Sequence, residues 1–224
     1  MARNRLNRAE PNSIKFVTIR IMKIGPKYKI ARRLQAPIFE KTQTPKYALS
    51  LARKERTGGK KGRPKSSSEF GLQLLEKQKA RFSYGLGDKQ FRNNVMKALH
   101  SEVPVQKLFT LLEARLDNVL YRAGLAKTRA SARQIASHGH ALVNGRRVTV
   151  PSIILSKGDV VTIRPGSANS PLFAEVEERM KVVTSPAWLK TEPGVRSVEV
   201  LEPPVYTPGE QVFDLGVVIE FYNR

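Results

Sequence analysis

The chain has 224 residues, of which 40 are Lys or Arg and 19 are Asp or Glu, so its formal net charge is +21 and its isoelectric point is near 10.5. This excess is typical of nucleic-acid-binding proteins, and an anionic membrane surface is the competing partner. No run of about 18 apolar residues could span a bilayer, and nothing resembles a secretory signal. The lack of cysteine excludes a thiolate zinc site and a cysteine nucleophile, and it fits a reducing compartment.

The positive charge is concentrated toward the N-terminus. Residues 1–100 carry a net charge of +19, residues 101–165 carry +6 and residues 166–224 carry −4. Contacts with phosphate depend on such cations. We therefore expect the N-terminal half to make the deeper nucleic-acid contact and the C-terminal end to face protein or solvent.

Residues 1–65 are predicted to form a basic, extended N-terminal segment. They are rich in Lys, Arg, Pro and Thr, and their apolar residues follow no sustained period that could build an independent core. Residues 58–65 read Gly-Gly-Lys-Lys-Gly-Arg-Pro-Lys. This composition indicates a flexible basic loop whose backbone can follow phosphates once bound.

Two helices are expected in residues 66–111. Ser66 and Glu69 fit a capping box at the start of the first helix, and Asp88 can cap the second. The residues expected to face inward are Leu72, Leu75 and Phe82 in the first helix and Phe91, Val95 and Leu99 in the second. The outer face of the first helix is expected to present Lys77, Lys79 and Arg81.

A further helix is predicted to end near Gly124, and another to begin at Thr128, whose hydroxyl can accept a hydrogen bond from a first-turn amide. The apolar stripe of the earlier helix consists of Leu108, Leu111, Leu112, Leu116, Val119 and Leu120. The later helix has a narrow buried face made by Ala132, Ile135 and Ala136. Gly139 suits the left-handed residue that ends this helix.

Arg129 and Arg133 lie four residues apart, so they are expected to project side by side from the exposed helix face. Neither has a carboxylate at helical spacing, and like charges at this spacing need an anionic partner. A hairpin follows, with Asn144-Gly145 as the favoured two-residue turn. Guanidinium groups and a helix N-terminus both supply donors that phosphate oxygens accept. We expect four guanidinium groups to converge on one surface: those of Arg129, Arg133, Arg146 and Arg147.

The C-terminal third is predicted to contain a strand, a helix and a second strand. Residues 160–163 are β-branched and follow a turn. Ser170 and Pro171 mark the helix start, and the buried side of that helix is expected to consist of Leu172, Phe173, Val176 and Met180. Residues 217–222 are predicted to form the terminal strand.

Four short motifs stand out in residues 112–164: Arg115-Leu116-Asp117, Thr128-Arg129-Ala130, Ser137-His138-Gly139 and Val143-Asn144-Gly145. Together they resemble the RNA-binding domain named after the fourth small-subunit ribosomal protein (S-four). Similar domains occur in pseudouridine synthases, some aminoacyl-tRNA synthetases and heat-shock RNA-binding proteins. The flanking residues 69–85 and 89–93 resemble the ribosomal protein family itself, and this similarity covers most of the chain.

The resemblance implies an α+β fold. A helical first domain would contain an inserted small α/β RNA-binding domain, made of two helices and a short antiparallel sheet, and a basic extended N-terminus would precede both. We divide the chain into the segment 1–65, a helical domain 66–111 and an RNA-binding domain 112–165. Residues 166–224 are expected to return and pack on the helical domain, which they complete.

The resemblance also implies a structural protein of the small ribosomal subunit that acts by binding and is not an enzyme. Its implied partners are the 5′ domain of small-subunit rRNA, neighbouring proteins of the S-five and S-three families, and mRNA where it enters the subunit. Early subunit assembly and decoding accuracy would depend on these contacts. We expect a cytoplasmic rather than an organellar ribosome, and no cofactor, metal, membrane or small-molecule substrate.

RNA contacts are expected from basic and polar side chains in the glycine-rich loop, the first two helices and the RNA-binding domain. These candidates are Lys60, Lys61, Arg63, Lys77, Lys79, Arg81, Arg92, Arg115, Lys127, Thr128, Arg129, Arg133, His138, Asn144, Arg146 and Arg147. Single-stranded regions and junctions of RNA are recognised through phosphates, 2′-hydroxyls and shape, which requires cations on rigid elements.

An RNA-modifying or RNA-chaperoning protein is the alternative. A triplet similar to Arg115-Leu116-Asp117 holds the catalytic Asp of pseudouridine synthases, but in a separate catalytic domain. Here Asp117 lies inside an amphipathic helix, so we expect it to orient Arg115 or Arg122 instead. Sedimentation of a lysate separates the alternatives, because only a ribosomal protein is stoichiometric with the small subunit.

Two smaller features leave alternatives open. His138 and His140 could be two metal ligands, but no third ligand is evident nearby, which favours helix-end or RNA-contact roles. Some relatives in the family carry zinc-binding cysteines near the N-terminus, and this chain has none. Residues 1–21 match nothing in the family, and we expect a misassigned start or a basic tail, disordered off the ribosome, rather than a transit peptide.

Overall fold

The computed structural model describes residues 24–56 and 68–224 of the chain. The α-helices are α1 (Lys27–Leu34), α2 (Pro45–Arg56), α3 (Glu69–Ser83), α4 (Asp88–Leu99), α5 (Pro104–Glu113), α6 (Leu116–Arg122), α7 (Arg129–Ser137), α8 (Val176–Val182) and α9 (Leu215–Asn223). The strands are β1 (Ala141–Val143), β2 (Arg146–Arg147), β3 (Val160–Ile163), β4 (Leu189–Glu192) and β5 (Ser197–Val200), and 3₁₀ turns span η1 (Glu40–Gln43), η2 (Pro165–Ser167) and η3 (Pro171–Phe173). None of the described helices is both long enough and apolar enough to cross a membrane.

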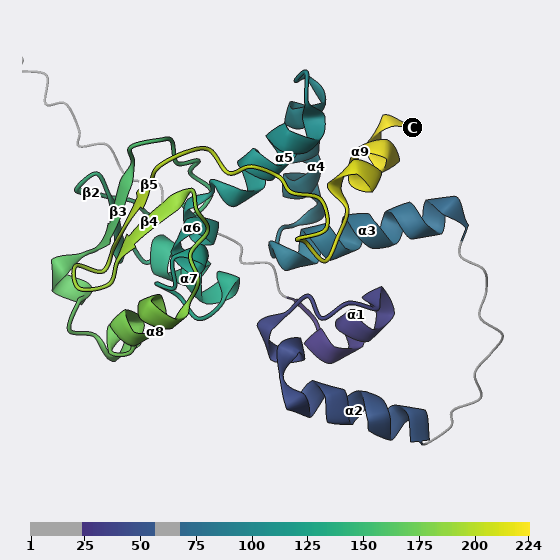
Figure 1. The fold of residues 1–224 in the computed structure, drawn as a ribbon, viewed down its shortest axis with the longest axis horizontal. Coiled ribbons are helices and arrows are strands. Elements are labelled where there is room, and N and C mark those ends of the chain that lie inside the picture. The colour runs from purple at the N-terminus through teal and green to yellow at the C-terminus, as the bar shows by residue number, and fades with distance from the viewer. Residues whose placement is uncertain (1–23, 57–67) are drawn as a thin grey trace, which may run out of the picture.

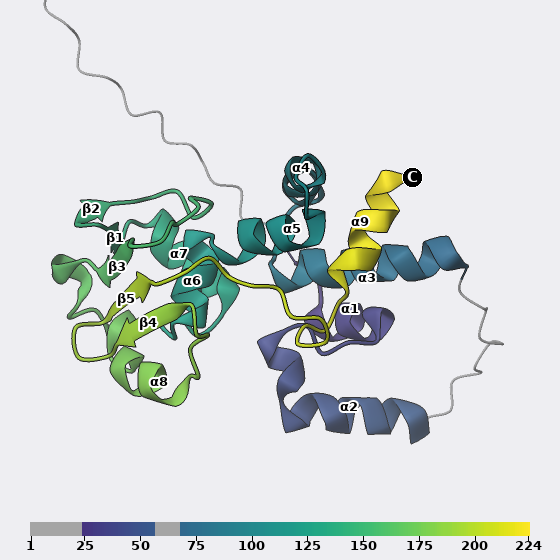
Figure 2. The same ribbon diagram turned by 45° about the horizontal axis from the view of Figure 1, so that its top comes forward.

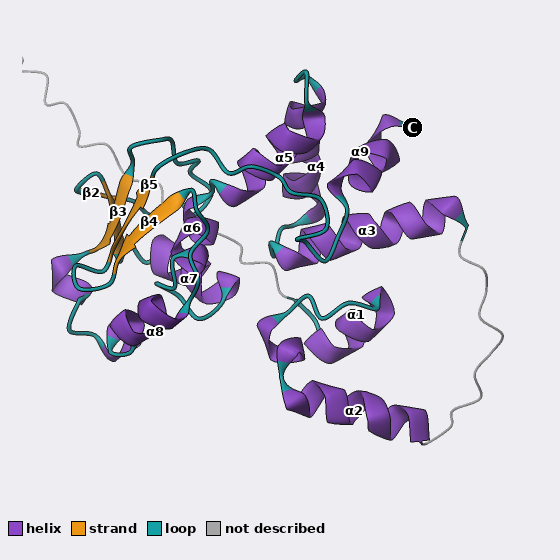
Figure 3. Cartoon of the chain, viewed as in Figure 1, coloured by secondary structure: helices purple, strands orange, loops and turns teal. Residues whose placement is uncertain are grey.

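The described chain forms three packed parts, which Figures 1 and 2 show from two sides. We call residues 114–200 the sheet lobe, residues 68–113 with 203–224 the helical lobe, and residues 24–56 the N-terminal unit. Each part surrounds its own cluster of buried apolar side chains. In the described residues all strands lie in the sheet lobe, as the colouring in Figure 3 makes plain. This mixture of separate helical and strand regions confirms the predicted α+β fold.

The sheet lobe is a five-stranded antiparallel sheet in the order β2-β1-β3-β5-β4, covered by α6, α7 and α8. The β1–β2 hairpin turns over Asn144 and Gly145, whose φ angles of 49° and 75° suit the predicted two-residue turn. The Thr128 hydroxyl accepts a hydrogen bond from the Ser131 amide and so begins α7, and Gly139 adopts φ 69° just beyond its end. These local predictions are confirmed.

Residues 166–200 pack in the sheet lobe, whereas we expected them to pack on the helical domain. The core of the sheet lobe includes Phe173, Val176 and Met180 from this segment, and β5 pairs with β3. Only the last part of the chain crosses back to the helical lobe, where Leu215 and Val218 are fully buried. The expected return is therefore made by about twenty residues at the C-terminus rather than by the whole of 166–224.

The terminal segment predicted as a strand is the helix α9. The Asp214 carboxylate accepts a hydrogen bond from the Gly216 amide and caps the helix. A run of β-branched residues suggests a strand, but here α9 packs against α3 and α5, and this packing determines its conformation. Tertiary contacts thus outweigh local propensity.

The single helix predicted up to Gly124 is in fact two helices, α5 and α6, broken at Arg115. The backbone of Arg115 is extended, with φ −66° and ψ 140°. It forms a β-bridge with Ile154, and the Leu116 amide donates to the Ile153 carbonyl at 2.8 Å. The break occurs because a distant loop hydrogen-bonds to this backbone in place of the helix.

The expectation of an extended N-terminal segment is wrong for residues 24–56. They form α1, η1 and α2 around a cluster that includes Leu34, Phe39 and Tyr47. Much of this cluster comes from the loop between the helices, so it has no helical period, and Leu75 and Phe82 of α3 pack against it. Residues 1–23 and 57–67 lie outside the described part, as do the predicted contacts Lys60, Lys61 and Arg63 and the predicted cap Ser66.

Several details of the two predicted helices at the start of the helical lobe also differ. Ser68, whose hydroxyl accepts from the Gly71 amide, caps α3, and Gly87 rather than Asp88 is the N-cap of α4. Leu72 is 53% exposed, although it was expected to face inward. In η3, Leu172 is likewise exposed. The two caps thus lie two positions and one position from those predicted, and the two leucines face solvent.

Candidate nucleic-acid interface

A buried carboxylate lies where the two lobes meet. Asp117, in the first turn of α6, is only 2% exposed. The Arg115 guanidinium donates to both of its oxygens, with N to O distances of 3.0 Å each. The Arg133 Nε donates to its Oδ2 at 2.8 Å. Two cations thus enclose one anion inside the protein, and the prediction that Asp117 orients Arg115 is confirmed.

Arg133 also joins the lobes. Its Nη2 donates to the Tyr84 carbonyl at 2.9 Å, and its Nη1 donates to the Gly85 carbonyl. Both carbonyls lie at the end of α3, in the helical lobe. The prediction that Arg133 projects from the exposed face of α7 is therefore wrong. Its carboxylate partner comes from another helix, sixteen residues earlier in the chain, and no search at helical spacing finds it.

A second buried network lies beside the first. Glu113, at the end of α5, is 1% exposed. Its carboxylate accepts two hydrogen bonds from Arg122 at 2.8 and 2.9 Å, one from the Tyr84 hydroxyl at 2.7 Å and one from Asn118 at 2.8 Å. Because Tyr84 directly follows α3 and Arg122 lies in α6, this network also spans the two lobes. Neither Tyr84 nor Glu113 carries a motif that would identify it in the sequence.

The pKa values in this second network shift as the geometry requires. Burial alone would raise the pKa of Glu113, but the charge and hydrogen bonds of Arg122, the charge of Arg129 and the Tyr84 hydrogen bond together outweigh burial, and the pKa lies below its usual value. Burial, followed by the charge of Glu113, raises the pKa of the Tyr84 hydroxyl well above its usual value. The pair therefore consists of a charged carboxylate and a neutral phenol near neutral pH.

Arg129, the first residue of α7, lies at the edge of this junction. Its Nε donates to the Asn118 side chain at 2.8 Å, and its guanidinium lies 4.4 Å from the ring centre of Tyr121 and 5.1 Å from that of Tyr84. Its amide donates to the Glu40 carboxylate of the N-terminal unit at 3.4 Å. Arg129 is half-buried rather than freely projecting, so it does not pair with Arg133 on an exposed face.

The predicted contacts on α3 are mostly engaged within the protein. Lys77 is 9% exposed, forms an ion pair with Asp88 at 3.2 Å and lies over the rings of Phe221 and Tyr222. Lys77 was expected on the outer face of α3, but α9 packs against α3 and covers this side chain. Lys79 pairs with Glu76 of its own helix. The remaining side chains of this group are Arg81, which lies over the ring of Phe82, and Arg92 on α4, which is exposed.

The other predicted contacts lie at the far end of α7 and on the hairpin. Arg146 and Arg147 are exposed, and Arg147 Nη2 donates to the His138 carbonyl at 3.2 Å. The Asn144 side chain instead bonds to Asp159 and to the Val160 amide and fixes the hairpin. The four arginines expected on one surface are thus divided, with Arg129 and Arg133 at the lobe junction. Lys127 and Thr128 precede α7, where Lys127 pairs with Glu175 at 2.6 Å, both side chains being exposed.

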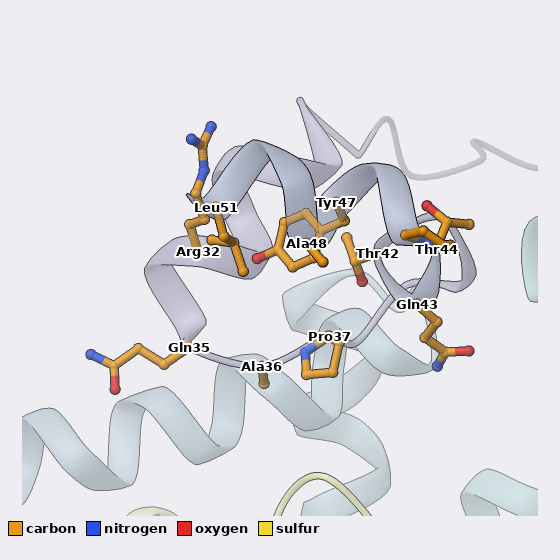
Figure 4. Close-up of a pocket in the computed structure, with 11 residues that line it drawn as sticks. Arg32, Gln35, Ala36, Pro37, Thr42, Gln43, Thr44, Tyr47, Ala48 and Leu51 are labelled. Atoms are coloured by element: carbon orange, nitrogen blue, oxygen red, sulfur yellow. The ribbon is translucent and has the colours of Figure 1, made fainter. Parts of the chain in front are cut away.

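The described residues contain no group of three or more His, Asp or Glu side chains placed to hold a metal ion. A shallow cavity of about 740 Å³ opens in the N-terminal unit between η1 and α2, with Tyr47 at its centre (Figure 4). Pro37, Ala48 and Leu51 contribute apolar walls, and Arg32 is the one charged residue that lines it. No His, Asp or Glu is among the described residues that line this cavity.

The geometry defines a basic protein of two lobes joined by buried ion networks. A family model described as "Ribosomal protein S4/S9 N-terminal domain" matches residues 22–113, and one described as "S4 domain" matches residues 114–161. The boundary between the two matches falls at the break between α5 and α6.

Three relatives share the name small ribosomal subunit protein uS4. The protein from Roseiflexus castenholzii is 40% identical over 209 residues, which is 90% of this chain and 98% of the relative. Those from Streptococcus mutans and Corynebacterium kroppenstedtii are 41% and 38% identical, each over 89% of this chain and over 97% and 98% of their own lengths. The chain belongs to the uS4 family of small ribosomal subunit proteins.

The first prediction concerns Arg133. Replacing it with Met leaves the buried Asp117 with one cation and removes both bonds to the helical lobe, so we expect a loss of about 3 kcal/mol in the free energy of unfolding. The matched change Arg146→Met, on the exposed hairpin, should cost about 0.5 kcal/mol or less. Urea unfolding followed by circular dichroism measures both. Equal losses in the two variants would show that the Arg133 contacts do not hold the lobes.

The second prediction uses the pH dependence of Glu113. Because the folded state lowers its pKa, its contribution to stability is complete above the unfolded value of about 4.5 and is lost as the pH falls through the folded value. Glu113→Gln should therefore destabilise the protein more at about pH 6 than at about pH 3 relative to the unsubstituted chain. Urea midpoints at both pH values test this. The exposed control Glu178→Gln should show no such change, and a pH-independent loss in Glu113→Gln would contradict the assignment.

Proposed function

We propose that this chain is a structural component of the small ribosomal subunit that binds small-subunit rRNA with its two lobes held as one rigid unit. The observation that carries the proposal is the bond pair from Arg133 to the Tyr84 and Gly85 carbonyls. Lobes that are fixed before binding lose less conformational freedom when RNA orders them. Family membership supports small-subunit rRNA as the ligand, and the bonds between the lobes support binding by both lobes as one unit.

The proposed phosphate contacts are the predicted cations that remain at the surface. Arg92 and Arg146 form no ion pair within the described residues, and Arg147 bonds only to a backbone carbonyl. Lys127 pairs with Glu175, but an ion pair this exposed contributes little and can exchange for phosphate. We propose that Arg115, Arg133 and Lys77 act instead as positioning residues, since their charges are satisfied inside the protein.

The finer function follows from the family and the charge distribution. We propose that the protein binds a helix junction in the 5′ domain of the rRNA, helps to nucleate assembly of the subunit and supports decoding accuracy in a cytoplasmic ribosome. The net charge of −4 over residues 166–224 suits protein neighbours better than RNA. Proteins of the S-five and S-three families, beside the mRNA where it enters the subunit, are the proposed neighbours.

We propose binding without chemistry. Asp117, the one residue that resembles a catalytic Asp of RNA-modifying enzymes, is buried, and both of its oxygens accept hydrogen bonds from arginines. A nucleophile must reach the reacting atom of its substrate. In this geometry Asp117 is a structural anion.

A footprint of the purified chain on naked small-subunit RNA tests the function directly. We expect protection of a compact set of helices in the 5′ domain, with sites for both lobes present at the same protein concentration. Protection by one lobe at a concentration at which the other lobe leaves no footprint would contradict binding as a rigid unit. Sedimentation of a lysate provides the second test, since a protein absent from the small subunit would not serve the proposed function.

The third prediction concerns the salt dependence of rRNA binding. Each phosphate contact releases counterions, so Arg146→Gln should weaken binding by about tenfold or less and reduce the slope of log affinity against log salt by about one. The control Lys190→Gln lies on β4, at the opposite edge of the sheet from the hairpin strand β2, and should leave the slope unchanged. Filter binding at several salt concentrations measures both. An unchanged slope in Arg146→Gln would remove the hairpin from the interface.

A further inference from the structure

A group of positive and protonatable side chains surrounds the end of α7. We call it the histidine cluster and define it as His138, His140, Arg147 and Arg164. The ring centres of His138 and His140 are 5.9 Å apart. The His140 Nδ1 lies 2.9 Å from the Ser167 hydroxyl, and the ring meets Phe173 edge-on. His140 therefore has one nitrogen and one ring edge fixed by its neighbours.

Gly139 allows the cluster to form. A Cβ atom at this position would lie 2.3 Å from Arg147 Nε and within 3 Å of two further guanidinium atoms, so any other residue would displace the side chain. Arg147 crosses the glycine and donates to the His138 carbonyl at 3.2 Å. The guanidinium thus lies against the backbone between the two histidines, at the carboxyl end of a helix, which favours positive charge.

The charges that act on His140 all have the same sign. Burial is the largest influence that lowers its pKa, and the charges of His138, Arg164 and Arg147 follow, from the end of α7, the residue after β3, and β2. Within the described residues neither Arg147 nor Arg164 forms an ion pair with a carboxylate. Like charges gathered in this way repel one another until an anion arrives.

We propose that the histidine cluster binds a phosphate of the RNA backbone and takes up a proton from solvent when it does so. The inference rests on the proposed function and adds a site to it. The phosphate oxygens would accept from the Arg147 and Arg164 guanidinium groups and from the His140 nitrogen that Ser167 leaves open. Arg164 and Ser167 are absent from the contacts expected from the sequence, whereas His140 was expected to have a helix-end or RNA-contact role.

The proton uptake follows from the charges. The positive charges of Arg147 and Arg164 help to keep the pKa of His140 low. A bound phosphate would neutralise these charges, so the pKa of His140 would rise on binding. Linkage then requires RNA to bind more tightly as the pH falls between the bound and the free pKa. One such proton changes the affinity by at most about tenfold for each pH unit, and we expect about three- to tenfold between about pH 8 and about pH 6.

The third histidine of the chain provides a matched control. His100 follows α4 in the helical lobe and is exposed. We compare rRNA affinity at about pH 8 and about pH 6, at constant ionic strength, for the unsubstituted chain, for His100→Asn and for the double variant His138→Asn with His140→Asn. The unsubstituted chain and His100→Asn should show the full pH effect, and the double variant should show little or none.

Ring signals of His140 in the full-length protein provide a second readout that does not depend on the variants. Followed by NMR as the pH changes, they should give a higher pKa with rRNA bound than without it. Inorganic phosphate alone, as the other source of the same oxyanion, should leave that pKa unchanged. An equal rise with inorganic phosphate would assign the site to free phosphate and overturn the RNA assignment.

Two outcomes separate this inference from the proposed function. Tight rRNA binding that does not change with pH, or a pH effect that persists in the double variant, would overturn the histidine cluster as a phosphate site while the proposed function stands. Absence of rRNA binding at both pH values would overturn the proposed function and this inference with it.

Discussion

The structure depends on one buried carboxylate, Asp117, enclosed by the guanidinium groups of Arg115 and Arg133. Burying an isolated charge costs several kcal/mol of free energy. The Asp117 carboxylate and its two cationic partners must therefore stay buried together. Arg115 is held at the break between α5 and α6, where its extended backbone pairs with Ile154. Arg133 uses its remaining donors on carbonyl groups at the end of α3. These hydrogen bonds therefore fix how the two lobes are placed relative to each other.

The Asp117 network explains why only some of the positive charges of this small basic protein are exposed at its surface. Cations at the junction are neutralised internally, whereas those on the hairpin and on α4 remain exposed. The glutamate network around Glu113 adds a second connection between the same two lobes. Since Tyr84 contributes its hydroxyl to one network and its carbonyl to the other, both connections share this one residue at the end of α3. The cations of the two lobes would then lie at fixed distances from one another. An RNA that contacts both lobes would be recognised specifically by its shape.

Two features set by short stretches of chain were predicted correctly from the sequence, whereas features set by distant contacts were not. The cap at Thr128 and the turn at Asn144-Gly145 depend on a few neighbouring residues, and both are present as expected. The Arg133 contact was missed because its partners are 16, 48 and 49 residues away. Residues 217–222 were predicted as a strand because several of them are β-branched, but packing on α3 makes them helical in α9. For the candidate site, residue types identified the surface cations of the hairpin, but only the fold distinguishes them from the arginines that position the lobes.

The claim that the lobes form one rigid unit before RNA binds can be measured by pulsed electron paramagnetic resonance. The chain has no cysteine, so Lys97→Cys on α4 and Lys190→Cys on β4 introduce two unique and exposed label positions, one in each lobe. We predict a single narrow distance distribution in the free protein that keeps its position when small-subunit rRNA is added. A broad distribution that narrows only with RNA would contradict the account, because the RNA and not the Asp117 network would then set the arrangement of the lobes.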